Sequence, residues 1–160
     1  MNWDLLDFLV FGTMLTILMA IVALARRRTR NRAYRGAVLI AVLGAFFLVW
    51  VNGAVGIIGH EGNDANLLYF GVLGVAVVGS FVARFKAQGM ALVLYATAIA
   101  QVLVAAFAIT VDLGAAGPIW PRDILVMTAI FSVIWVLSGW LFSRAAKHER
   151  RLFADSPFLR

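Results

Sequence analysis

Side chains able to do acid–base or metal chemistry gather in one short segment, residues 52–66, which reads NGAVGIIGHEGNDAN. His60, Glu61 and Asp64 provide an imidazole and two carboxylates there. Such groups can act as general acid and base, so the segment is a candidate site for an enzyme working at the outer face of a membrane. A zinc site needs three or four ligands in fixed geometry. Because the HExxH spacing and a nearby second histidine are both missing, we expect no metal.

A plainer interpretation of the same segment is a solvated turn between two helices. Gly59 suits the end of the first helix, because glycine adopts the left-handed conformation without strain. Asn63, Asp64 or Asn66 can then cap the next helix by accepting hydrogen bonds from its free N–H groups. The sequence alone leaves the catalytic and the structural interpretation open.

Asn52, Thr97 and Gln101 are polar residues within otherwise apolar stretches. If they line one cavity, the chain is a channel or transporter for a small neutral or hydrophobic solute. If they bond neighbouring helices instead, each such hydrogen bond contributes about 0.6–2 kcal/mol to helix association. No Lys, Arg, Asp, Glu or His lies within these stretches, which argues against a proton-coupled pump.

The densest basic cluster is the segment RRRTRNRAYR, residues 26–35. Its arginines are Arg26, Arg27, Arg28, Arg30, Arg32 and Arg35. Basic side chains beside an anionic leaflet attract lipid head groups by about 1 kcal/mol each. No nucleic-acid-binding module surrounds the cluster, so we expect no nucleic-acid partner. The cluster is therefore interpreted as a determinant of membrane orientation that also contacts anionic lipid.

The composition sets the class of protein. The chain has 160 residues and no cysteine, is 63% hydrophobic and is only 14% charged. A soluble domain carries about 25% charged residues, and a helix needs about 20 apolar residues to cross the hydrocarbon core of a bilayer. Five stretches meet that need, at residues 8–25, 36–58, 67–83, 90–111 and 124–142. The sequence thus predicts an all-α fold, with residues 1–160 forming a single domain of five transmembrane helices.

Charge placement predicts the orientation of this bundle. With the N-terminus outside, the segments 26–35, 84–89 and 143–160 lie inside and carry a formal charge of +11. The outer segments carry −5, which restores the net charge of +6. Thirteen of the 14 basic residues then lie inside, as the positive-inside rule requires. We expect an outside N-terminus and a cytoplasmic C-terminus.

Small residues at helical spacing occur on two of the apolar stretches. They are Gly53, Gly56 and Gly59 on one stretch, and Gly71, Gly74 and Gly79 on the next. Small residues let transmembrane helices approach closely. The sequence does not separate packing within the chain from contact with another membrane protein or a second copy.

Four segments carry a resemblance to known proteins. They read VNGAVGIIG at 51–59, NLLYFG at 66–71, ARFKAQGMA at 83–91 and GWLFSRAA at 139–146. In these the chain resembles small uncharacterised bacterial inner-membrane proteins of a four-helix type, with an additional N-terminal helix here. The resemblance implies a compact bundle in a bacterial inner membrane. It carries over no activity and no functional residue.

The absence of chemical motifs shapes the functional prediction. The chain contains no nucleotide-binding loop, no nucleophile elbow, no paired haem ligands and no thiol. We therefore expect a non-enzymatic protein without a cofactor, an accessory or scaffolding subunit that packs against partner membrane helices. The channel or transporter and the outer-face enzyme are the alternatives.

Overall fold

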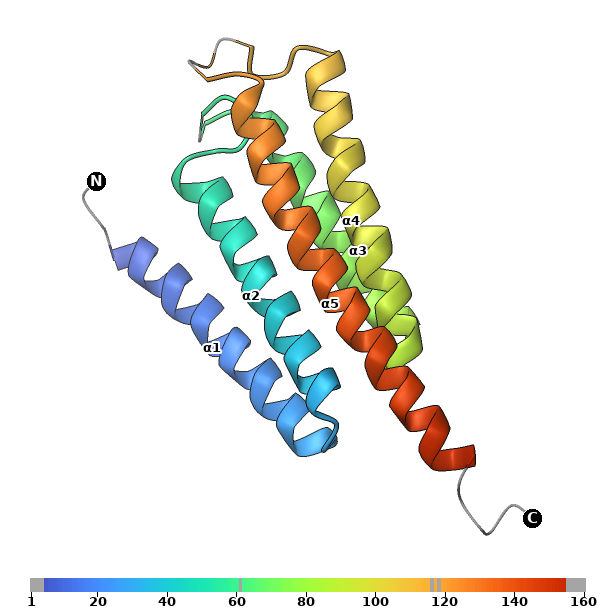
Figure 1. Cartoon of the computed structure of the whole chain (residues 1–160). Helices are drawn as coiled ribbons and strands as arrows, with labels where there is room; N and C mark the ends of the chain where they lie inside the picture. Colours follow the sequence, from blue (N-terminus) through green and yellow to red (C-terminus); the bar gives the residue numbers. More distant parts are fainter. Residues whose placement is uncertain (1–4, 61, 116, 118, 155–160) are drawn as a thin grey trace.

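A computed structural model of the chain describes residues 5–60, 62–115, 117 and 119–154. Among these residues the regular structure is entirely helical (Figure 1). The elements are α1 (Leu5–Arg28), α2 (Arg32–Ala54), the 3-10 helix η1 (Asp64–Leu67), α3 (Leu68–Val82), α4 (Ala87–Thr110) and α5 (Arg122–Ala154).

Five helical segments are long and apolar enough to cross a membrane, which confirms the predicted all-α class and the number of candidate spans. They are Asp7–Arg28, Arg32–Ala54, Asp64–Val82, Ala87–Thr110 and Arg122–Leu152. The last is longer than its apolar stretch because α5 continues past Phe142 through a basic segment. Good helix formers such as Ala, Lys, Glu and Arg fill that extension.

The helices do not share the packing equally. Helix α5 packs extensively against α4 and α2, and α3 packs against α4, so that α2–α5 form one bundle. Helix α1 packs chiefly against α2 at the edge of that bundle (Figure 1). Only 6% of the most apolar part of α1 is buried, compared with 28–33% for α2, α4 and α5. The structure is therefore a four-helix bundle with one peripheral helix.

Small residues bring the bundle helices together. A Cβ added at Gly44 of α2 would lie 2.5 Å from Ile134 Cγ2 and 3.2 Å from the ring of Trp135 on α5. Trp135 is among the largest fully buried side chains. A Cβ at Gly79 of α3 would likewise lie 2.8 Å from Val93 of α4. These glycines are used for packing within the chain, because any larger residue would push the helices apart.

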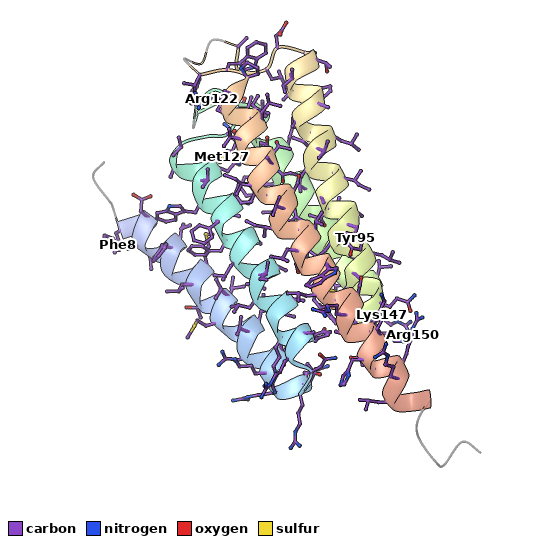
Figure 2. All side chains as sticks on the ribbon, in the orientation of Figure 1. Phe8, Tyr95, Arg122, Met127, Lys147 and Arg150 are labelled. Carbon is purple, nitrogen blue, oxygen red and sulfur yellow. The ribbon has the colours of Figure 1, made fainter. Side chains whose placement is uncertain are left out.

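The ends of the bundle differ in charge. The α1–α2 turn, the α3–α4 turn and the C-terminal part of α5 lie at one end, called the basic end below (Figure 1). The described residues of the long connections 55–63 and 111–121 lie at the other, the loop end. Figure 2 shows Lys147 and Arg150 at the basic end and Arg122 at the loop end. The basic connections that the sequence assigns to one side of the membrane therefore lie at the same end of the bundle.

The predicted end of the second helix was wrong. Helix α2 ends at Ala54, and Gly56 adopts the left-handed conformation after it, with φ at +74°. The N–H groups of Val55 and Gly56 both donate to the Val51 carbonyl, which closes the last turn. Gly59 also has a positive φ, of +78°, but it lies within the connection and ends no helix.

Candidate functional site

Asn66 organises the connection between α2 and α3. Its side chain is 95% buried, and its Oδ1 accepts hydrogen bonds from the N–H groups of Ile57 and Ile58, each at 2.9 Å. Its Nδ2 donates to the His60 carbonyl at 2.7 Å. Asn52, at the end of α2, donates from Nδ2 to the Asn66 carbonyl at 2.9 Å. One buried amide thus satisfies backbone groups that a buried loop would otherwise leave unpaired.

The two long connections at the loop end touch through their backbones. Gly114 has φ at +81°, and a Cβ added to it would lie 2.8 Å from the Gly59 nitrogen. A Cβ on Gly59 would lie 3.0 Å from the Gly114 Cα. Glycine is required at both positions by the positive φ and by the close approach. The contact closes the loop end over the buried side chains of Ile57 and Ile58.

The candidate acid–base residues lie on the surface of this cap. His60 is exposed, and its Nδ1 accepts a hydrogen bond from the Gly62 N–H at 3.2 Å. Asp64 is exposed in the first turn of η1. Glu61 lies outside the described residues. In the part of the chain that the structure describes, no three His, Cys, Asp or Glu side chains come together to hold a metal ion.

Of the three residues expected to cap the next helix, Asn63 caps η1, whereas α3 itself begins after Leu67 without a side-chain cap. Asn63 Oδ1 accepts from the Ala65 N–H at 3.0 Å, which begins η1 and leads directly into α3. Asn66, the other asparagine proposed for this role, instead bonds the preceding loop. The structural interpretation of residues 52–66 therefore accounts for Asn52, Asn63, Asn66, Gly56 and Gly59 without a bound substrate.

The three candidate transport residues do not form one site. Asn52 belongs to the loop-end network, whereas Thr97 and Gln101 lie in the middle of α4 and are fully buried. Thr97 Oγ1 donates to the Val93 carbonyl of its own helix at 2.8 Å. Neither atom of the Gln101 amide has a hydrogen-bond partner among the described residues. The Gln101 amide is thus a buried polar group whose burial costs free energy that no hydrogen bond among the described residues offsets.

Other buried polar groups of the bundle are also incompletely bonded. The buried hydroxyls of Tyr69 on α3 and Thr128 on α5 have no hydrogen-bond partner among the described residues. Ser132 Oγ and Trp135 Nε1 have no partner among the described residues either. By contrast, Ser138 Oγ donates to the Ala37 carbonyl at 2.8 Å and ties α5 to α2. Polar contacts inside the bundle are therefore unevenly satisfied.

The arginine cluster surrounds the tight turn between α1 and α2. Asn31 caps α2 by accepting from the N–H groups of Ala33 and Tyr34, and its Nδ2 donates to the Ala145 carbonyl of α5 at 3.2 Å. The Thr29 hydroxyl accepts from the Asn31 N–H at 3.1 Å. These bonds fix the direction in which α2 leaves the turn and dock the turn on α5.

Three of the six arginines line a groove between α1 and α2. It has a volume of about 370 Å³ and is formed by Val22, Arg26, Arg32, Arg35, Gly36 and Leu39. Arg27, Arg28 and Arg30 do not line it. Arg35 is held in place, because its Nε donates to the Thr29 carbonyl and its Nη2 to the Arg26 carbonyl, both at 2.7 Å. The six arginines, which look equivalent in sequence, therefore form two groups, three that line the groove and three that do not.

A second groove lies between α4 and α5 and has a volume of about 430 Å³. Its lining is apolar apart from the side chains of Tyr95 and Ser132. Gln101, Thr97 and Asn52 do not contribute to either groove.

Helix α1 presents a row of small residues that sequence reasoning missed. Gly12, Thr16 and Ala20 follow one another at intervals of four, and all three are exposed. Nothing lies within 4 Å of a Cβ added at Gly12, and Thr16 Oγ1 donates back to the Gly12 carbonyl at 2.7 Å. The interval of four is the signal that would have identified the row, because such residues share one helix face.

The opposite face of α1 is the one that packs on the bundle. Leu18 and Ala25 are buried there, and Phe11 makes edge contacts with Phe46 and Trp50 of α2 at centroid distances of 5.7 and 5.0 Å. The exposed small residues thus point away from α2 and contribute nothing to the contact of α1 with its own bundle.

Comparison with protein-family models, with curated proteins and with solved structures finds no match to this chain. The resemblance to bacterial inner-membrane proteins of a four-helix type therefore stays a prediction, and its functional interpretation rests on the residues above.

Proposed function

We propose that this chain is a non-enzymatic accessory or scaffolding subunit of a membrane, and that α1 docks against a transmembrane helix of a partner protein. The observation that carries the proposal is the exposed row Gly12, Thr16 and Ala20, on the face of α1 that points away from α2. The α2–α5 bundle is the anchor on which α1 is displayed.

The physical reason lies in how helices associate in lipid. Lipid tails are as apolar as leucine, so helices gain nothing by hiding apolar surface from them. Association comes instead from close backbone approach over small residues. Contact with lipid explains why α1 is apolar all round, but it does not require Gly, Thr and Ala at intervals of four on one face.

Under this proposal the chain is a multi-pass protein of a bacterial inner membrane, with its N-terminus outside and its C-terminus in the cytoplasm. The α3–α4 turn, which carries Arg84 and Lys86, lies at the same end as the α1–α2 turn, and so do Lys147 and Arg150 of α5 (Figures 1 and 2). This gathering of basic residues supports the orientation. The anionic lipids of the cytoplasmic leaflet are the expected lipid partners of that end.

One observation favours a second candidate function, a channel or transporter for a small neutral solute. The fully buried Gln101 amide has no partner among the described residues, and an unpaired buried amide suits a group that bonds a passing solute. Against it, no groove described for the chain reaches Gln101. The accessory subunit therefore remains the leading proposal.

Co-purification from native membranes tests the proposal. The chain is extracted in mild detergent, and bound membrane proteins are identified by mass spectrometry. Gly12→Leu combined with Ala20→Leu is expected to reduce the recovered partner at least tenfold. Gly71→Leu is the matched control, because a side chain at Gly71 also meets nothing within 4 Å. A chain recovered alone as a monomer, with neither partner nor second copy, contradicts the proposal.

A further inference from the structure

We infer that the groove between α1 and α2 binds one anionic phospholipid, with its phosphate between Arg26 and Arg32 and an acyl chain along Val22 and Leu39. The inference is independent of the docking role, because the groove lies between α1 and α2 whereas the row at Gly12, Thr16 and Ala20 lies on the face of α1 that points away from α2. On this inference the lipid binds at a defined site lined by Arg26, Arg32 and Arg35, and is not merely attracted by all six arginines.

The arginines of the groove carry charge that no acidic side chain of the described residues neutralises. No ion pair joins Arg26, Arg32 or Arg35 to an acidic side chain of the described residues. Arg35 is already bonded to the Thr29 and Arg26 carbonyls, so it contributes its charge from a fixed position. Arg26 and Arg32 stand on the two sides of the groove, one on each helix, and can contact one phosphate from both.

The residues that line the groove follow a fixed order along the two helices. Val22 precedes Arg26 by one turn on α1, and Leu39 follows Arg35 by one turn on α2. Because the two helices run in opposite directions from the shared turn, both apolar residues lie on the side of the arginines away from the basic end. The groove is basic at its mouth and apolar toward the middle of the spans, which matches the head group and acyl chain of a phospholipid.

The chemistry of the head group is shared with free phosphate, but the apolar part of the groove selects the lipid. A free phosphate ion uses only the mouth and leaves Val22 and Leu39 without a ligand contact. A phospholipid uses both regions. A phospholipid is therefore the inferred ligand, and inorganic phosphate is the competitor in the test.

Native mass spectrometry of the full chain in mild detergent measures the binding. The probe is dioleoylphosphatidylglycerol, with dioleoylphosphatidylcholine as the uncharged reference. We expect one phosphatidylglycerol to bind more tightly than any further copy. Arg26→Gln combined with Arg32→Gln is expected to raise its Kd about 30-fold. Arg27→Gln combined with Arg30→Gln removes the same charge outside the groove and is expected to change Kd less than threefold.

A second variant distinguishes binding in the groove from non-specific attraction by surface charge. Val22→Phe keeps every charge but fills the apolar end, and it is expected to weaken phosphatidylglycerol binding at least fivefold. If the arginine double variant aggregates, Val22→Phe alone tests whether the lipid binds in the groove. Arg35 is left intact in all variants because it holds the turn.

Three results overturn the inference. Equal weakening by the two arginine double variants indicates diffuse attraction without a site. Unchanged binding in Val22→Phe removes the acyl-chain contact. Full displacement of the lipid by millimolar inorganic phosphate assigns the mouth to free phosphate. Partner recovery is measured in the same preparations, and Gly12→Leu should leave lipid binding unchanged, so failure here is distinguishable from failure of the docking proposal.

Discussion

The side-chain amide of Asn52 donates a hydrogen bond to the backbone carbonyl of Asn66 at 2.9 Å, and thereby joins the end of α2 to the start of α3. The Asn66 side chain in turn accepts from the N–H groups of Ile57 and Ile58. Two asparagines therefore hold the loop end closed, and the position of Asn52 is explained without a solute pathway.

Replacing Asn66 by Ala should destabilise the protein by about 2–4 kcal/mol. The variant leaves the N–H groups of Ile57 and Ile58 buried without an acceptor, and each such loss costs about 1–3 kcal/mol. Reversible unfolding in mixed dodecylmaltoside–SDS micelles measures the change. Asn63→Ala is the control, because loss of a cap on a partly exposed turn costs only about 1 kcal/mol. Equal losses in the two variants would show that Asn66 is not the organising residue.

Replacing Gln101 by Met should leave stability unchanged or raise it by about 1–3 kcal/mol. The amide is fully buried and lacks partners among the described residues, so an apolar side chain of similar shape removes a cost and breaks no bond. The same unfolding assay measures this. A loss above 1 kcal/mol would mean that the amide has a bonding partner, and lost solute uptake in a stable variant would favour the transporter.

Gly44→Ala should destabilise the bundle by about 1–3 kcal/mol, because the new Cβ lies 2.5 Å from Ile134 and the helices must move apart. Gly71→Ala adds the same atom where nothing lies within 4 Å. It should be neutral or stabilising by up to about 1 kcal/mol, since alanine is the better helix former. Thermal unfolding in detergent compares the two. Similar losses in both variants would contradict the close α2–α5 contact.

Orientation can be tested with single cysteines, because the chain contains none. Asn63→Cys at the loop end should react with a membrane-impermeant maleimide in spheroplasts. Arg30→Cys, in the α1–α2 turn, should react only after the membrane is opened. Reversed labelling would overturn the outside N-terminus. Labelling of both positions from one side would contradict the alternation of the spans.

Much of the fold could be predicted from the sequence because continuous apolar runs of about 20 residues admit few alternatives. The end of α2 could not. Gly56 and Gly59 both suit a left-handed position, and the choice depends on Asn66, which holds Ile57 and Ile58 outside the helix. The apolar pattern of the helix does not reveal these side-chain bonds from a residue beyond the connection.

The candidate sites divide in the same way. The arginine cluster is obvious in sequence, but which members line a groove depends on the turn fixed by Asn31 and on the direction of α2. The row at Gly12, Thr16 and Ala20 is readable from spacing alone. The direction of this face, away from α2, could not be predicted from the sequence, because it depends on how Phe11 and Leu18 pack.

Photocrosslinking from α1 tests the docking role most directly. A photoreactive amino acid replaces Thr16 in native membranes, and Phe81, exposed on α3, is the control position. If α1 docks on a partner helix, position 16 gives a discrete protein adduct that Gly12→Leu abolishes, and position 81 gives lipid adducts alone. Lipid adducts alone from both positions would contradict the docking role.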